Sequence, residues 1–177
     1  MVLPLAADWS DVVIRRLRAT DDVANWTCGD DPWAREVADY LIEDALNQMQ
    51  LGMAVTLVFE HDSRLAGFCS ILGNSLRTED EPSTANLNLG YSEAPCLQIG
   101  RFGVHSDYQG SGLSRYMMRW VRAYAREVDV GFRFLSLHVR NDNRPGRRFW
   151  VREGFKQVSR RSGSRYQFMV YDLYQDE

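Results

Sequence analysis

The chain has 177 residues, which is enough for one domain with a sizeable hydrophobic core. Hydrophobic residues make up 45% of it and charged residues 25%, as is ordinary for a soluble globular protein. The net charge of −3 excludes a general electrostatic attraction to nucleic acid or to an anionic membrane.

The chain also lacks the usual signs of a membrane, secreted or metal-binding protein. No run is long enough to span a membrane, and the N-terminus has neither the basic start nor the apolar stretch of a signal peptide. Cys28, Cys69 and Cys96 are widely spaced and match no metal-ligand pattern. The three histidines are scattered as well. We therefore expect a reduced, cytoplasmic protein without a metal site.

The first half of the chain alternates between strand and helix patterns. Strands are expected at residues 12–18, 53–60 and 65–73. Residues 20–28 predict a short helix or a loop. Residues 32–49 predict a helix, because Pro32 suits the first helical position and Gly52 lies shortly beyond the end. The polar segment 74–95 has no periodicity and is expected to be a surface loop.

The second half continues this alternation. Strands are expected at residues 96–104 and 134–140, and a closing hairpin at 156–161 and 165–174. A helix is expected from Leu113, where apolar residues recur with helical spacing as far as Tyr124. A shorter helix is expected at 143–153, ended by Gly154. This alternation indicates an α/β fold with a mixed sheet.

A strand, a glycine turn and a helix start follow one another at residues 101–114. The first backbone N–H groups of a helix have no intrahelical acceptor, and the helix dipole favours negative charge beside them. Gly110 and Gly112 allow a phosphate to approach the main chain closely. This segment therefore predicts a site for a pyrophosphate-bearing ligand.

The spacing in this turn excludes two common phosphate motifs. The Gly-Lys-Ser/Thr ending of a Walker loop is absent. The third glycine of a dinucleotide-binding fold is also missing. The acidic residue expected about 20 positions further on in that fold is not on a second strand. Here Glu127 and Asp129 come at or after the end of the helix.

Two blocks instead resemble the GNAT acetyltransferase superfamily. The pattern Gln-x-x-Gly-x-Ser starting at Gln109 is similar to its acyl-CoA loop, with Ser114 in a position that is usually Gly or Ala. The second block, residues 135–155, is similar to its Asn-x-x-Ala-x-x-Phe-Tyr segment followed by Gly-Phe. The residues in that register are Asn143, Gly146, Phe149, Trp150, Gly154 and Phe155. The resemblance covers roughly residues 55–160.

The resemblance implies an α/β fold of the GNAT type. One domain is expected over residues 1–177, with its core motifs at 96–155. Its mixed, mostly antiparallel central sheet would have about six or seven strands, with about four flanking helices and a V-shaped splay between the middle strands.

The resemblance also implies acetyl-CoA, or another short acyl-CoA, as co-substrate. The backbone of Phe102–Val104 would pair with the pantetheine arm, and the amides from Gln109 to Ser114 or Arg115 would hold the pyrophosphate. Asn143 would hydrogen-bond the cofactor near its amide groups. The implied cofactor contacts are Phe102, Gly103, Val104, Gln109, Gly110, Ser111, Gly112, Leu113, Ser114, Arg115, Asn143 and Phe149. Arg147 or Arg148 could meet a cofactor phosphate or form a solvated helix face.

Two residues stand where the family keeps its proton-transfer groups. Trp150 occupies the position of the usual Tyr acid, and an indole N–H does not give up its proton near neutral pH. Trp150 would then donate a hydrogen bond or simply pack against the cofactor arm. His138 lies five residues before Asn143, where related enzymes often carry a Glu base. An imidazole suits that role at neutral pH, although a packed strand histidine is an equal alternative.

The acceptor stays open at this point. A primary amine of a small molecule or of a peptide or protein is the first expectation. Similarity to toxins that acetylate aminoacyl-tRNA appears at Cys28–Gly29, Leu65–Phe68 and Gly100–Val104. Residues 140–165 also hold nine Arg/Lys against two acids. The acidic net charge and Trp150 argue against aminoacyl-tRNA as the acceptor. A non-catalytic acyl-CoA sensor or partner-binding domain is the third alternative, and a homodimer stays undecided.

Overall fold

The computed structural model describes residues 9–77, 91–158 and 164–174. The chain forms two compact units, one from residues 1–71 with 101–120 and one from residues 72–100 with 121–177. We describe each unit by itself, and the single domain over residues 1–177 stays a prediction.

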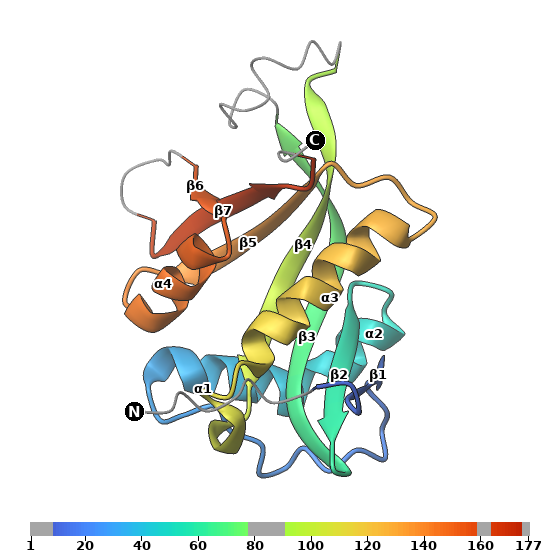
Figure 1. The fold of residues 1–177 in the computed structure, drawn as a ribbon, viewed down its shortest axis with the longest axis vertical. Coiled ribbons are helices and arrows are strands. Elements are labelled where there is room, and N and C mark those ends of the chain that lie inside the picture. The colour runs from blue at the N-terminus through green and yellow to red at the C-terminus, as the bar shows by residue number, and fades with distance from the viewer. Residues whose placement is uncertain (1–8, 78–90, 159–163, 175–177) are drawn as a thin grey trace. The chain divides into compact units, whose positions relative to one another are not determined.

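In the described part of the chain, seven strands follow the order β1-β2-β3-β4-β5-β7-β6 (Figure 1). Their bounds are β1 Val13–Arg16, β2 Val55–His61, β3 Arg64–Arg77, β4 Glu93–Val104, β5 Phe134–Arg140, β6 Lys156–Gln157 and β7 Tyr166–Asp172. β4 pairs with β5 in parallel, whereas β1–β2, β2–β3, β5–β7 and β6–β7 are antiparallel. The predicted mixed, mostly antiparallel sheet of six or seven strands is confirmed.

The bounds of the helices are α1 Pro32–Asp39, α2 Ala45–Gln50, α3 Leu113–Glu127 and α4 Arg144–Arg152. α1 and α3 begin at the residues that the sequence predicts, and α4 begins one residue after its predicted start. A π-helical segment, Tyr40–Asp44, joins α1 to α2 and was not predicted. Residues 20–28 form turns, with no helix or strand. Over the described ranges, no helix has the length and apolar character needed to cross a membrane.

Two segments predicted from the sequence have different bounds in the structure. The loop expected over 74–95 is wrong at both ends, because β3 continues to Arg77 and β4 begins at Glu93. Leu76 and Ala94 anchor these extensions in the core of the second unit, and two isolated apolar residues gave too weak a pattern to show it. Residues 78–90 lie outside the described residues. In the closing hairpin, the described part of the first strand is Lys156–Gln157, and residues 159–163, which include the end of that expected strand, also lie outside the described residues.

In the first unit, α1, α2 and α3 pack on strands whose side chains alternate in direction. Val58 and Phe68 join the core of α1 and α2, which includes Ala34, Ala38, Leu41 and Ala45. The next residue of β2, Phe59, makes an edge-to-face contact with Trp120 of α3, with ring centres 5.8 Å apart. Because successive strand residues point to opposite faces, α1 and α2 cover one face of β2 and β3, and α3 covers the other.

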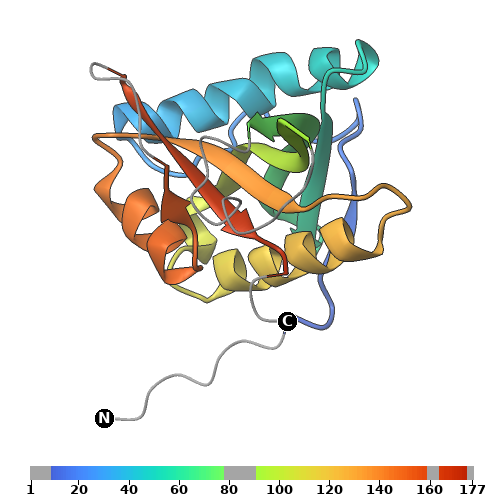
Figure 2. The same cartoon turned by 90° about the horizontal axis from the view of Figure 1, so that it is seen from above.

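In the second unit, neighbouring residues of β7 point to opposite faces and contact different groups of residues. Val170 joins a core of Leu76, Ala94, Cys96, Phe134 and Val158. The neighbouring Tyr171 points the other way, toward Phe155, with ring centres 5.5 Å apart. The Arg122 guanidinium lies 4.7 Å from the Tyr171 ring centre and forms an ion pair of 3.1 Å with buried Glu153. α4 lies beside β6 and β7 in this unit (Figure 2).

The pairing between β4 and β5 is short. It joins Cys96–Ile99 to Phe134–Leu137 in parallel register, although β4 runs on to Val104 and β5 to Arg140. β5 keeps its antiparallel pairing with β7 along its full length. The end of the ladder at Ile99 and Leu137 agrees with the splay predicted between the middle strands.

Candidate functional site

The turn between β4 and α3 is tied to distant parts of the first unit. The backbone N–H of His105 donates to the carbonyl of Ala66, and that of Ser106 donates to the carbonyl of Thr27, both at 2.9 Å. The Gln109 side-chain amide donates to the carbonyl of Cys28 at 2.7 Å and to that of Val104 at 3.2 Å. The side chain of Gln109 therefore holds the turn in place.

Two glycines give this turn its conformation. Gly110 has φ +76° and Gly112 has φ +92°, both in the region that residues with a side chain rarely adopt. A Cβ on Gly110 would meet no heavy atom within 4 Å, so open space lies beside the backbone there. The backbone N–H groups of Gly110, Gly112 and Ser114 have no acceptor among the described residues.

The intervening amides are used within the protein. The N–H groups of Gln109, Ser111 and Leu113 donate to Ser106 O, Tyr108 O and Ser111 Oγ at 3.3–3.4 Å. The N–H of Arg115 donates to the carbonyl of Gly112 at 3.1 Å. The unbonded donors therefore alternate along the turn, at the positive end of the 15-residue helix α3. This arrangement fits a diphosphate, because alternate amides can reach its separate oxygens.

Gly103 on β4 is required by packing within the unit. A Cβ there would lie 2.7 Å from Trp26, 3.0 Å from Val37 and 3.1 Å from Phe68. The sequence attributed this glycine to the approach of a pantetheine arm. The structure adds a second reason, because any side chain at Gly103 would collide with the aromatic core. The pairing of Phe102–Val104 with a cofactor stays a prediction.

In the second unit, Asn143 caps α4. Its Oδ1 accepts the N–H of Gly146 at 2.8 Å, and a Cβ on Gly146 would lie within 2.8 Å of the Asn143 side chain. Asn143 therefore has a structural role that the sequence interpretation did not include. Its oxygen is engaged in the cap, so any contact with a cofactor falls to the Nδ2 group.

Trp150 and Phe149 belong to an aromatic cluster at the end of α4. Trp150 is 7% exposed, and its ring centre lies 4.9 Å from that of Phe149 and 5.3 Å from that of Phe155. Trp150 therefore packs within this cluster, and its role toward the cofactor stays a prediction. The indole N–H adds no acid to this cluster.

His138 lies on β5 with its side chain exposed, between buried Leu137 and Val139. Its ring is 4.9 Å from that of Phe168, its cross-strand neighbour on β7. The exposure leaves the imidazole accessible to solvent, as a proton acceptor requires. Its role as a base stays a prediction.

A polar cluster in the first unit was missed by the sequence interpretation. The Tyr40 hydroxyl lies 2.8 Å from the Ser70 hydroxyl, and Ser70 is buried. The Arg101 guanidinium lies 5.3 Å from the Tyr40 ring centre and 3.7 Å from the Glu36 carboxylate. These residues come from α1, the π-helical segment, β3 and β4, so no local pattern could have revealed them.

A second cluster bears on the expected absence of metal. Single ligand atoms of Asp11, His61 and Asp62 lie within 4.8 Å of one another. The two carboxylate side chains are 61% and 78% exposed, as solvated acids commonly are. The absence of a metal site stays a prediction.

The family profile of the Acetyltransferase (GNAT) family matches residues 20–155. The chain belongs to the GNAT acetyltransferase family. The matched range includes the glycine turn, both catalytic candidates and all the predicted cofactor contacts. The comparison with curated protein sequences gives no match.

Several solved structures share the fold. AtaT complexed with acetyl-methionyl-tRNAfMet is 17% identical, with a TM-score of 0.72 over 89% of this chain and 94% of that chain. A Tyr-to-Phe mutant of KacT is 22% identical, with a TM-score of 0.70 over 92% and 95%. AtaTR bound with AcCoA is 16% identical, with a TM-score of 0.70 over 92% and 94%. At these identities, the likeness shows that this chain has the GNAT fold.

Proposed function

We propose that this acetyltransferase moves an acetyl group from acetyl-CoA to a primary amine of a small molecule, peptide or protein. Direct attack by the amine in a ternary complex needs no covalent enzyme intermediate. The observation that carries the proposal is the set of unbonded amides at Gly110, Gly112 and Ser114. They would hold the diphosphate, and the thioester of the bound donor supplies an activated acyl group.

The chain's own groups divide the remaining work. His138, exposed on β5, would accept the proton of the attacking amine. Trp150, packed against Phe149 and Phe155, would shape the site without donating a proton. A thiolate whose conjugate thiol has a pKa of about 8.5 is an adequate leaving group, so solvent can supply the final proton.

A second acceptor, the amino group of an aminoacyl-tRNA, is favoured by one comparison. The AtaT structure with a similar fold holds acetyl-methionyl-tRNAfMet. An α-amine has a pKa of about 7.7–8.0, so a substantial fraction is neutral near pH 7.5 and needs little help to attack. The third alternative, an acyl-CoA sensor, would bind the donor without turnover.

The decisive experiment measures donor binding and turnover with the purified protein. Calorimetry with acetyl-CoA tests the turn, and release of free CoA thiol is then followed over panels of amines, peptides and aminoacyl-tRNA. We expect donor binding, and thiol release with a subset of acceptors. No donor binding would refute the proposal, and binding without turnover on any panel would favour the sensor.

The protein's own thiols should not disturb this assay. Cys28, Cys69 and Cys96 are all buried. Burial raises the pKa of Cys28 and of Cys96 to about 11 and that of Cys69 to about 12. Since the thiolate is the reactive form, these residues should stay unreactive at neutral pH.

Substitutions test the two catalytic candidates. His138→Ala should lower kcat by about 10²-fold or more near neutral pH and move the activity profile to higher pH, because a general base contributes roughly 10²- to 10⁴-fold. Trp150→Phe should keep the rate within several-fold. An unchanged pH profile in the first variant, or a collapse in the second with donor binding intact, would contradict these roles.

A further inference from the structure

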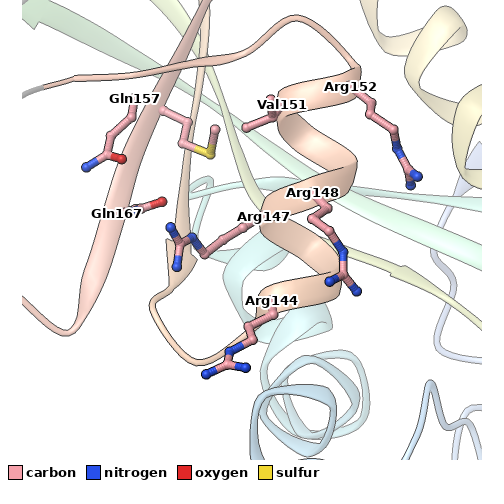
Figure 3. A pocket seen from close by; sticks show the side chains of 8 residues that line it. Arg144, Arg147, Arg148, Val151, Arg152, Gln157 and Gln167 are labelled. Carbon is pink, nitrogen blue, oxygen red and sulfur yellow. The ribbon is translucent and has the colours of Figure 1, made fainter.

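A groove with a cavity volume of about 530 Å³ lies between α4 and the strands β6 and β7 in the second unit (Figure 3). Half of the residues that line the groove are arginines of α4, namely Arg144, Arg147, Arg148 and Arg152. The others are Val151, Gln157, Gln167 and Met169. In Figure 3, Arg147 and Val151 extend from the helix toward Gln157 and Gln167, while Arg144 lies at the N-terminal end of the helix.

The arginines of α4 have no carboxylate counterion in the described ranges. No carboxylate among the described residues forms an ion pair with Arg144, Arg147, Arg148 or Arg152. The two acids that flank the helix are engaged elsewhere, because Asp142 pairs with Arg140 at 2.6 Å and Glu153 pairs with Arg122. The positive charge of the groove is therefore not neutralised by its neighbours in the described structure.

One guanidinium is already held in place by the fold. Arg147 donates through Nη1 to the carbonyl of Asn141 at 3.3 Å. Its Nε is buried and has no hydrogen-bond partner among the described residues. A buried donor without an acceptor is costly, so a shift of the Arg147 side chain that exposes Nε to an acceptor in the groove would be favoured.

The arrangement also opposes the stability of the helix itself. Cations in the first turn of a helix face the positive end of its dipole, and like charges four residues apart repel. Arg144, Arg148 and Arg152 follow one another at that spacing on α4, with no acidic residue in the helix. Arg152, in the last turn, suits the negative end of the dipole. Local stability does not explain Arg144 and Arg148, whereas an anionic ligand would.

The chemistry of the groove favours a nucleic-acid strand over a single anion. Arg144 and Arg152 are separated by a helical rise of about 12 Å, so the charges form a row suited to successive phosphates. Guanidinium groups bind phosphate oxygens in pairs and stack on bases. The apolar side chains of Val151 and Met169, with the amides of Gln157 and Gln167, offer contacts to sugars and bases.

We propose that the arginine groove of α4, β6 and β7 binds the phosphate backbone of an RNA strand. The site goes beyond the proposed acetyl transfer, because it assigns a ligand to residues that neither the glycine turn nor the catalytic candidates use. RNA bound there would bring phosphates to Arg144, Arg148 and Arg152 and an acceptor to the Nε of Arg147. The groove and the donor site can be tested separately.

The test is fluorescence anisotropy with labelled deacylated tRNA and with a short single-stranded RNA, over a series of salt concentrations. The variant Arg144→Gln/Arg148→Gln/Arg152→Gln removes three charges that make no described ion pair. The matched control, Arg16→Gln/Arg18→Gln/Arg35→Gln, removes three exposed charges from the first unit. Circular dichroism verifies that both variants fold. Acetyl-CoA calorimetry on both variants reports whether Arg148, which could meet a cofactor phosphate, also contributes to donor binding, and the single variants Arg144→Gln and Arg152→Gln test RNA binding without it.

We expect the groove variant to lose at least about tenfold in RNA affinity, while the control changes little. The slope of log affinity against log salt should fall by about 2, at about 0.7 per lost phosphate contact on a single strand. If the triple variant does not fold, single substitutions at Arg148 and Arg152 should each reduce the slope by about 0.7.

Three outcomes would overturn the proposal. The first is an equal loss of RNA affinity in the groove variant and the control. The second is displacement of RNA by free CoA with the same arginine dependence, which would assign the groove to the donor. The third is equal or tighter binding of a poly-glutamate peptide, which would assign the groove to an acidic protein partner. Failure of acetyl-CoA to bind wild type would instead refute the proposed acetyl transfer and leave the RNA result standing.

Discussion

The starts of α3 and α4 carry positive charge by different means. Before α3, Gly110 and Gly112 adopt positive φ, and alternate backbone N–H groups have no acceptor in the described protein. Before α4, Asn143 caps the helix. The positive charge at the start of α4 comes from arginine side chains. The first start offers main-chain donors at fixed positions, and the second offers long, adaptable cations.

This difference separates two kinds of specificity. Fixed amides suit one small ligand of defined geometry, such as a diphosphate. A row of guanidinium groups tolerates variation in a longer anionic chain, because each contact is made by a side chain with its own freedom. If the comparison holds, substitutions at the start of α3 should change the affinity for acetyl-CoA. Substitutions at the start of α4 should change the free energy of unfolding or the affinity for RNA.

We expect the largest effect on acetyl-CoA affinity from a proline in the first turn of α3, where α4 already has one. Pro145 occupies the first turn of α4, where a missing N–H is tolerated. Ser114→Pro should keep α3 folded but remove one unbonded N–H. Loss of a hydrogen bond to a charged group costs about 1.5–3 kcal/mol, or roughly 10- to 100-fold in the acetyl-CoA Kd by calorimetry.

Ser114→Ala is the control for this substitution, because it removes the hydroxyl and keeps the amide. It should bind acetyl-CoA as wild type does. Equal affinity in the proline and alanine variants would show that the amide of Ser114 does not contact the donor.

The next effect concerns the conformation of the turn. Gly112→Ala forces a side chain into φ +92°, with a strain of about 1–3 kcal/mol that the turn can relieve only by moving its amides. The acetyl-CoA Kd should rise by roughly 10-fold or more. Gly131→Ala is the matched control, since its Cβ would meet nothing within 4 Å and its φ is not positive. Comparable affinities in both variants would argue against a preset turn.

A smaller effect tests the cap of α4. Asn143→Ala should lower the free energy of unfolding by about 1 kcal/mol in urea denaturation, because the N–H of Gly146 loses its acceptor. Asn143→Asp keeps an accepting oxygen and should restore most of this stability. Acetyl-CoA affinity of the Asp variant then reports separately on the Nδ2 group, and a drop there would support its predicted cofactor contact. Failure of Asp to restore stability would contradict the cap.

The smallest effect has the opposite sign. Arg144→Gln should raise the free energy of unfolding by about 0.3–1 kcal/mol at low salt, because it removes a cation from the positive end of α4. The gain should shrink as salt screens the charges. Arg35→Gln, at an exposed position on α1, serves as the comparison. A loss of stability in Arg144→Gln would mean that this arginine has a structural partner.

These two helix starts also show what sequence can and cannot reveal. The turn before α3 is a continuous segment, so its glycines and its position after a strand could be interpreted directly. The tie from Gln109 to Cys28 joins residues 81 positions apart, and no local pattern contains it. The same holds for Gly103, whose neighbours Trp26, Val37 and Phe68 come from three other segments.

At α4, the sequence indicated an excess of basic residues over 140–165 but not how it is distributed. Arg140 is paired with Asp142, and the fold of α4 places Arg144, Arg148 and Arg152 along one groove. The extensions of β3 and β4 were missed for a related reason. Leu76 and Ala94 become buried through contacts with Phe134 and Val170, which lie far away in sequence.

The hydrogen bond from Gln109 to Cys28 has a consequence for how the protein responds to its donor. It connects the glycine turn to a segment that precedes α1, so the position of the turn is coupled to that of the segment. By thermodynamic reciprocity, a molecule held by the turn must strengthen the seating of residues 20–30. Amide protons in that stretch should then exchange more slowly when acetyl-CoA is present, although none of them belongs to the diphosphate cradle.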